Sequence, residues 1–143
     1  MQFFRTNSKG VSYNVKQIHA ALPKKHSEHL IFLHSFTGCD TVSAISSFGK
    51  VTALSKLCNS EKAEEHIKTF SSHESKKENL VRSGSNLFKI FYVGETAKSL
   101  EQLRFELFSK RATAGYRLNP DRLPPTAGAA AQHSLRAYLQ AQD

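Results

Sequence analysis

Apolar residues recur at intervals of three and four along most of this chain, and this spacing limits the folds open to it to largely helical ones. The clearest example is the segment 99–110, which Ser99 precedes as an N-cap with Gln102 three residues later. The segment 30–36 is apolar throughout and would suit a buried strand or a buried helix, but Ser27 as an N-cap favours the helix. The spacing therefore predicts a mainly α protein, a small helical array.

Further helices are expected wherever the spacing and a start or stop signal agree. Thr126 is expected to cap the last one, and Gly84 to weaken the one that contains it. The expected segments are 14–22, 27–36, 61–70, 79–93 and 127–142, together with a helix, a tight turn and a second helix over 41–57.

The chain of 143 residues suits a single domain with flexible or irregular ends. The expected organisation is a flexible N-terminus at 1–10, a helical region at 11–110, a Pro-containing linker at 111–125 and a C-terminal helix at 126–143.

Positive charge is in excess, with 20 Lys and Arg against 12 Asp and Glu, a formal net charge of +8. Such an excess favours a polyanionic partner, nucleic acid first and an anionic membrane surface second, although a basic protein without such a partner is the alternative. Neither a signal peptide nor an apolar stretch of membrane-spanning length is visible. We therefore expect no membrane partner and an intracellular location, nuclear or cytoplasmic, with Cys39 and Cys58 as free thiols.

Asp40 is the one carboxylate of the first half that lies in an apolar, glycine-flanked context. It could cap a helix beginning at Thr41, which the spacing favours, or bind a divalent cation such as Mg²⁺ or Mn²⁺. The histidines near Cys39 lack the paired spacing of a zinc site, and Cys39 itself is expected to be a buried small residue rather than a nucleophile.

The turn at Ser47–Lys50 has the composition of a phosphate-binding hairpin. Gly49 would let the backbone approach a phosphate at the start of the following helix, and Lys50 and Lys56 would add positive charge. The alternative is a plain pair of helices with a solvated lysine face, which the spacing alone slightly favours.

The segment Leu33–Leu57 resembles the core signature of flap-endonuclease-type, PIN-like nucleases. Gly38-Cys39-Asp40 matches the place where that family's Asp completes an acidic metal cluster, and the stretch from Ser47 to Ala53 matches its helix–hairpin–helix, with Ser47 in place of the first Gly. The resemblance implies Asp40 as a metal ligand. It also implies a nucleic-acid-binding set made of Ser47, Gly49, Lys50, Thr52 and Lys56.

A closer resemblance spans roughly residues 11–142. The string from His34 to Thr41, of pattern HxxxGCDT, and the string Leu123–Thr126, LPPT, are similar to those of uncharacterised animal proteins that carry a nuclease-like domain and accompany mobile elements.

Flap-endonuclease-type catalysis uses two metal ions held by several carboxylates, most of them on an α/β sheet domain that comes before this signature. Only 39 residues precede Asp40 here, without an Asp-x-Asp or Glu-x-Asp pair. We therefore expect a C-terminal part that lacks the sheet half, has no complete catalytic site, is inactive alone and binds Mg²⁺ or Mn²⁺ weakly. An apolar face such as that of 30–36 is then expected to stay exposed and to cause self-association.

Three functions follow as hypotheses. The first is a nucleic-acid-binding remnant or fragment of a nuclease-like domain, binding DNA without sequence preference, with RNA as the second candidate. The second is part of a metal-dependent phosphodiesterase joined to a missing N-terminal half. The third is a degenerate helical interaction module.

Overall fold

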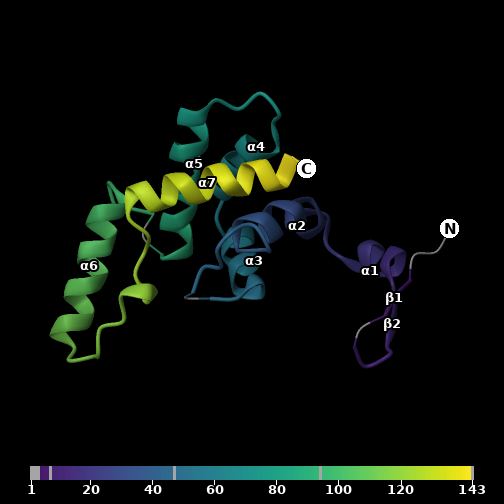
Figure 1. Ribbon diagram of the computed structural model, residues 1–143, viewed down its shortest axis with the longest axis horizontal. Helices are drawn as coiled ribbons and strands as arrows, with labels where there is room; N and C mark the ends of the chain where they lie inside the picture. Colours follow the sequence, from purple (N-terminus) through teal and green to yellow (C-terminus); the bar gives the residue numbers. More distant parts are fainter. Residues whose placement is uncertain (1–3, 7, 47, 94, 143) are drawn as a thin grey trace.

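The computed structural model describes residues 4–6, 8–46, 48–93 and 95–142, and this part of the chain is mainly helical, as predicted (Figure 1). The helices are α1 (Val15–Ala21), α2 (Lys24–Phe36), α3 (Lys50–Asn59), α4 (Ala63–Ser71), α5 (Lys77–Phe91), α6 (Leu100–Thr113) and α7 (Ala127–Gln142), with a 3₁₀ turn, η1, at Pro120–Arg122.

The N-terminal end carries the only strands among the described residues. Strand β1 (Phe4–Thr6), inside the region expected to be flexible, pairs antiparallel with β2 (Ser12–Asn14), with Arg5 opposite Tyr13. This ribbon and α1 project from the rest of the molecule (Figure 1), and α1 has no buried residue.

Helix starts agree with the prediction where a local cap determines them. The Ser99 hydroxyl accepts from the Gln102 amide at 3.1 Å at the start of α6, and the Thr126 hydroxyl accepts from the Ala129 amide at 3.3 Å at the start of α7. Helix α2 differs, because it begins at Lys24 after Pro23, and the Ser27 hydroxyl donates to the Lys24 carbonyl instead of capping.

The predicted helix–hairpin–helix over 41–57 is wrong in its first helix. Gly38, at φ +114°, turns the chain after α2, and a Cβ there would lie 2.5 Å from the Cα of Ala44. Cys39 and Val42 then exchange both backbone hydrogen bonds, at 3.0 and 3.3 Å, around a tight turn. The buried side chains of Val42 and Ile45 fix this stretch against the core in a non-helical conformation, so only α3 forms.

Phe36, at the end of α2, lies at the centre of the core. Its ring contacts aromatic rings from three other helices, with centroid distances of 5.5 Å to Phe70, 5.1 Å to Phe88 and 5.0 Å to His133. Helices α4, α5 and α7 thus cover most of the apolar face of α2 that was expected to stay exposed, while Leu30 is 38% and Ile31 69% exposed. The expectation that this face stays exposed is therefore wrong for Phe32, Leu33 and Phe36, and self-association of the chain stays a prediction.

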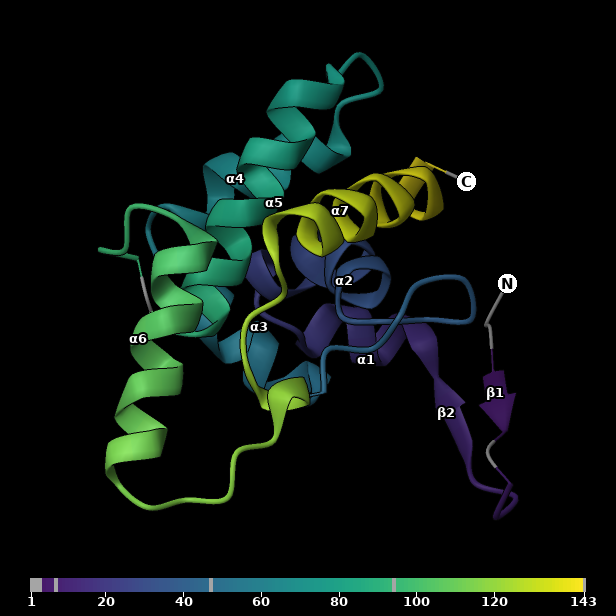
Figure 2. The ribbon, with the colours of Figure 1, turned by 60° about the vertical axis from the view of Figure 1, so that its left-hand side comes forward.

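Helix α7 crosses α5 at Gly84, where the two backbones approach closely (Figures 1 and 2). A Cβ at Gly84 would lie 1.8 Å from Oγ of Ser134. Gly84 was expected to weaken this helix, but α5 is continuous through it. The absence of a side chain at Gly84 allows α7 to pack closely against α5.

None of the helices in the described ranges combines the length and apolar content needed to cross a bilayer.

Candidate nucleic-acid interface

Asp40 is exposed at the tip of the turn between Cys39 and Val42. No helix begins at Thr41, so the predicted capping role is wrong. Within the described residues, no three His, Cys, Asp or Glu side chains gather closely enough to hold a metal ion. The side chains around Asp40 therefore do not fit a two-metal centre, which needs several carboxylates.

Lys50 points back to the end of α2. Its Nζ donates to the Gly38 carbonyl at 2.7 Å, to the Thr37 hydroxyl at 2.9 Å and to the His34 carbonyl at 3.4 Å. These groups lie at the negative end of the α2 dipole, so the ammonium caps that helix. The ammonium of Lys50 is thus bonded within the protein, to the end of α2.

Lys56 has a similar role at the end of α5. Its ammonium donates to the Phe91 carbonyl and lies 4.9 Å from the ring centroid of Phe48, and burial lowers its pKa. Lys25 donates likewise to the Cys58 carbonyl, near the end of α3, at 3.0 Å. The lysines nearest the predicted hairpin therefore contact helix ends.

The other predicted hairpin residues lie around the start of α3. Gly49 is its N-cap, with an extended backbone at φ −84° that any residue adopts, and Thr52 is exposed one turn later. Ser47 lies outside the described residues. The structure thus brings Gly49, Lys50 and Thr52 together at one helix start. Lys56, near the end of α3, directs its ammonium to the end of α5, and Asp40 lies at the separate turn.

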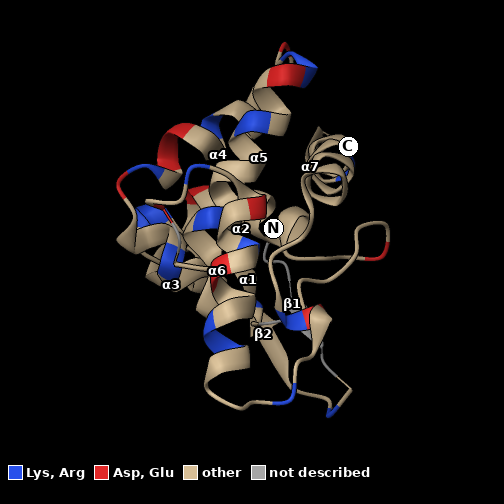
Figure 3. Ribbon diagram, turned by 90° about the vertical axis from the view of Figure 1, so that its left-hand side faces the viewer, with Lys and Arg blue, Asp and Glu red and all other residues tan. Residues whose placement is uncertain are grey.

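A second cluster of cations lies where α6 ends. We call it the basic face, and it consists of Lys110, Arg111, Arg117 and Arg122, on the last turn of α6 and on the connector 114–126 that leads to α7. Figure 3 shows Lys and Arg along this end of α6 and the connector below it. In the described part of the chain, the side chains of Lys110, Arg117 and Arg122 have neither a hydrogen-bond nor an ion-pair partner, and all three are exposed.

A Schellman motif sets the direction of the connector. The Gly115 amide donates to the Ala112 carbonyl and the Tyr116 amide to the Arg111 carbonyl, both at 3.2 Å, with Gly115 at φ +72°. Glycine adopts this left-handed backbone conformation without strain, and this allows the chain to reverse direction directly after α6. Tyr116 follows directly and is 72% exposed.

Two arginines of α6 hold the connector alongside the helix. Arg111 donates to the Arg122 carbonyl at 3.1 Å, and Arg104 donates to the Pro124 carbonyl. Asn119 caps η1 through a 3.0 Å bond from the Asp121 amide to its Oδ1. These contacts hold the part of the connector that carries Arg122 against α6.

Two hollows flank this connector. One, of about 850 Å³, is lined by Tyr116 and the three arginines of the basic face. The other, of about 390 Å³, is mainly apolar and is lined by Phe105 and Phe108 of α6. Leu118 and Pro120 line both hollows, so the two are adjacent.

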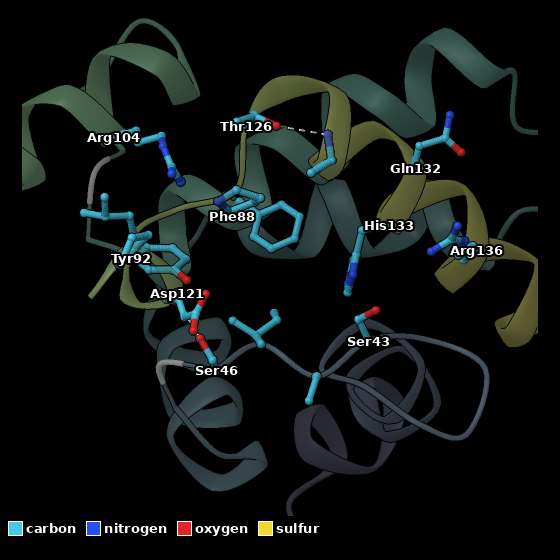
Figure 4. Close-up of a pocket in the computed structure, with 16 residues that line it drawn as sticks. Ser43, Ser46, Phe88, Tyr92, Arg104, Asp121, Thr126, Gln132, His133 and Arg136 are labelled. Atoms are coloured by element: carbon cyan, nitrogen blue, oxygen red, sulfur yellow. Dashed lines mark hydrogen bonds between the residues drawn. The ribbon is translucent and has the colours of Figure 1, made fainter. Parts of the chain in front are cut away.

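A cavity of about 490 Å³ lies between α7, the end of α5, the connector and the loop 43–46. His133 points from α7 into it, with Arg104 and Arg136 on either side (Figure 4). The His133 Nε2 lies 2.7 Å from the Phe36 carbonyl oxygen, which accepts only, so Nε2 carries the proton. Burial lowers the pKa of His133, with nearby Arg136 adding to the effect, and the imidazole is neutral at pH 7.

The basic face was not predicted from the sequence, because the stretch 111–125 was expected to be a linker. The signal was present, since the stretch 110–122 contains one Lys, three Arg and one Tyr against a single acidic residue, Asp121.

The chain matches no known protein family, no curated protein and no solved structure at a significant level. The resemblance to flap-endonuclease-type nucleases therefore stays a prediction from motifs.

Proposed function

We propose that this protein binds nucleic acid without sequence preference, and that it does so through the basic face. The observation that carries the proposal is that Arg117 and Arg122, exposed and without side-chain partners in the described ranges, line one hollow with the exposed Tyr116, while Lys110 adds an exposed charge on the last turn of α6. Unpaired cations on one face are the electrostatic signature of a phosphate-binding surface.

The proposal moves the contact from the predicted hairpin to the end of α6. A phosphate at the hairpin would have to draw Lys50 from its contacts with Thr37 and Gly38, and Lys56 from the Phe91 carbonyl. A phosphate at the basic face breaks no such contact, because within the described residues the side chains of Arg117 and Arg122 have no protein partner. The basic face therefore binds phosphate at lower cost.

The test is the salt dependence of DNA binding, followed by fluorescence anisotropy with a labelled duplex of mixed sequence. Each neutralised phosphate contributes about −0.9 to the slope of log affinity against log salt. The double variant Arg117→Ala/Arg122→Ala is expected to weaken binding of all sequences alike and to flatten the slope by about 2.

The matched control is Lys16→Ala/Lys77→Ala, which removes the same charge from exposed positions on α1 and at the start of α5. We expect the control to leave the slope nearly unchanged. Equal flattening by the two double variants would mean diffuse electrostatics and would overturn the proposal. A larger effect of Lys50→Met than of the double arginine variant would return the contact to the hairpin and also overturn it.

A further inference from the structure

Exposed aromatic rings lie next to the basic face. Phe105 is 69% exposed, Phe108 is 43% exposed and Tyr116 is 72% exposed. Phe105 and Phe108 line the apolar hollow, Tyr116 lines the arginine-lined hollow, and the two hollows share Leu118 and Pro120. Aromatic rings and cations thus lie in two adjacent hollows, which together we call the strip.

The two forms of nucleic acid differ in what they offer to such a strip. A duplex presents phosphates on its outside while its base faces are stacked inside. A single strand presents phosphates and also free base faces, which stack on aromatic side chains. Exposed phenylalanine rings gain nothing from a phosphate, so their place beside Arg117 and Arg122 favours a ligand with accessible bases.

The apolar hollow has the size and lining for this use. Its volume is about 390 Å³, and its mainly apolar lining includes Phe105, Phe108, Leu118 and Leu123. The two charged residues that line it are both bonded to the backbone, Arg104 to the Pro124 carbonyl and Glu101 to the Ala127 amide, so the hollow suits an uncharged flat group.

We infer that the preferred ligand is single-stranded nucleic acid, with phosphates along Arg117 and Arg122 and unpaired bases stacked on Phe105, Phe108 and Tyr116. This inference rests on the proposed function and narrows it to one substrate class. A second copy of the chain is a less suitable ligand for the strip. Two identical strips facing each other would bring their positive charges together.

The experiment compares a short oligothymidylate with a hairpin duplex, both labelled, at one low salt concentration. The variants are Phe105→Leu/Tyr116→Leu, which keeps apolar bulk and removes the rings, and Arg117→Ala/Arg122→Ala. Val51→Ala, at an 84% exposed position on α3, is the control for loss of an exposed apolar group.

We expect the aromatic variant to lose about 10-fold or more in affinity for the oligothymidylate and to bind the duplex as the parent does, since stacking on one ring is worth about 5- to 150-fold. The arginine variant is expected to weaken both ligands. A second readout is tryptophan fluorescence, because the sequence contains no tryptophan and an introduced one is the only indole. In Phe105→Trp, the single indole is expected to be quenched by the oligothymidylate and not by the duplex.

The two proposals fail differently. If the aromatic variant binds the oligothymidylate as tightly as the parent while the arginine variant weakens both ligands, the single-strand inference is overturned and the proposed function stands. If the arginine variant binds both ligands as the parent does, the proposed function itself fails. If sedimentation shows that the parent is a dimer and the aromatic variant a monomer, the strip joins two copies and the inference is overturned.

Discussion

The ammonium group of Lys50 lies 2.7 Å from the carbonyl oxygen of Gly38, so the first residue of α3 closes the end of α2. The positive φ of Gly38 turns the chain at this point, and the Thr37 hydroxyl adds a second acceptor at 2.9 Å. A lysine that the sequence predicts as a phosphate contact thus bonds the end of α2, and its part in ligand binding stays a prediction.

Replacing Lys50 by Met is expected to lower the free energy of unfolding by about 1 kcal/mol, because charge-assisted hydrogen bonds to the end of a helix are lost. Chemical denaturation measures the change. Lys16→Met, on the exposed α1, is the control and should be neutral. Unchanged stability together with weakened DNA binding would show that Lys50 serves the ligand and not the helix.

Replacing Gly84 by Ala is expected to destabilise the protein by about 2 kcal/mol, although alanine favours helices, because the new Cβ overlaps Ser134 at the crossing of α5 and α7. Gly128→Ala is the matched control, since a Cβ there meets nothing within 4 Å. Adding Ser134→Gly to the Gly84→Ala variant should restore part of the loss in a double-mutant cycle. Additive effects of the two substitutions would contradict the close contact.

Replacing Gly49 by Ser is expected to raise the melting temperature slightly, corresponding to a few tenths of a kcal/mol. The backbone of Gly49 is extended, the space around it is open, and α3 has no side-chain cap, so a serine hydroxyl would supply one. Gly115→Ser, where φ is +72°, should instead destabilise by about 1 kcal/mol. A loss of stability at Gly49 as large as that at Gly115 would show that the glycine at 49 is required.

Stability is expected to fall as the pH drops from about 7 to about 5. Burial lowers the pKa of His133, and likewise of His29 and His66, below the unfolded value of 6.5. The unfolded chain therefore takes up protons first, and stability that is complete above pH 6.5 is lost as the pH falls toward the lower folded-state values. Urea midpoints measured across this range should decline less in His133→Gln than in the parent, whereas the exposed-site variant His19→Gln should follow the parent. If the urea midpoint of His133→Gln declines as much as that of the parent, protonation of this imidazole does not lower the free energy of unfolding.

Local sequence predicted the helices whose ends are determined locally. Ser99 and Thr126 cap α6 and α7 through bonds to residues three positions ahead, which any reader of the sequence can find. The turn after Gly38 could not be found in this way. It depends on the burial of Val42 and Ile45 against a core built by distant segments, and that burial overrides the helical spacing.

The candidate site was harder to predict, because the position of a lysine in the sequence does not determine which acceptor oxygen its ammonium will bond. Lys50 reaches a carbonyl 12 residues away and Lys56 one 35 residues away, both at helix ends that exist only in the folded chain. The charges of the basic face were visible in the sequence, but Arg104 and Arg111 order the connector through contacts that no spacing rule contains.

The contact between His133 and Phe36 joins positions 97 residues apart, and this separation bears on how the protein folds. The central aromatic ring cannot be fully covered until the chain closes that long loop, whose entropic cost must be met before the contact repays it. Helices α2 to α5 contact one another over shorter separations and are expected to assemble first, with α7 docking after the rate-limiting step. Substitutions that loosen α7 should therefore speed unfolding far more than they slow folding, which places control of the protein's kinetic lifetime in its last helix.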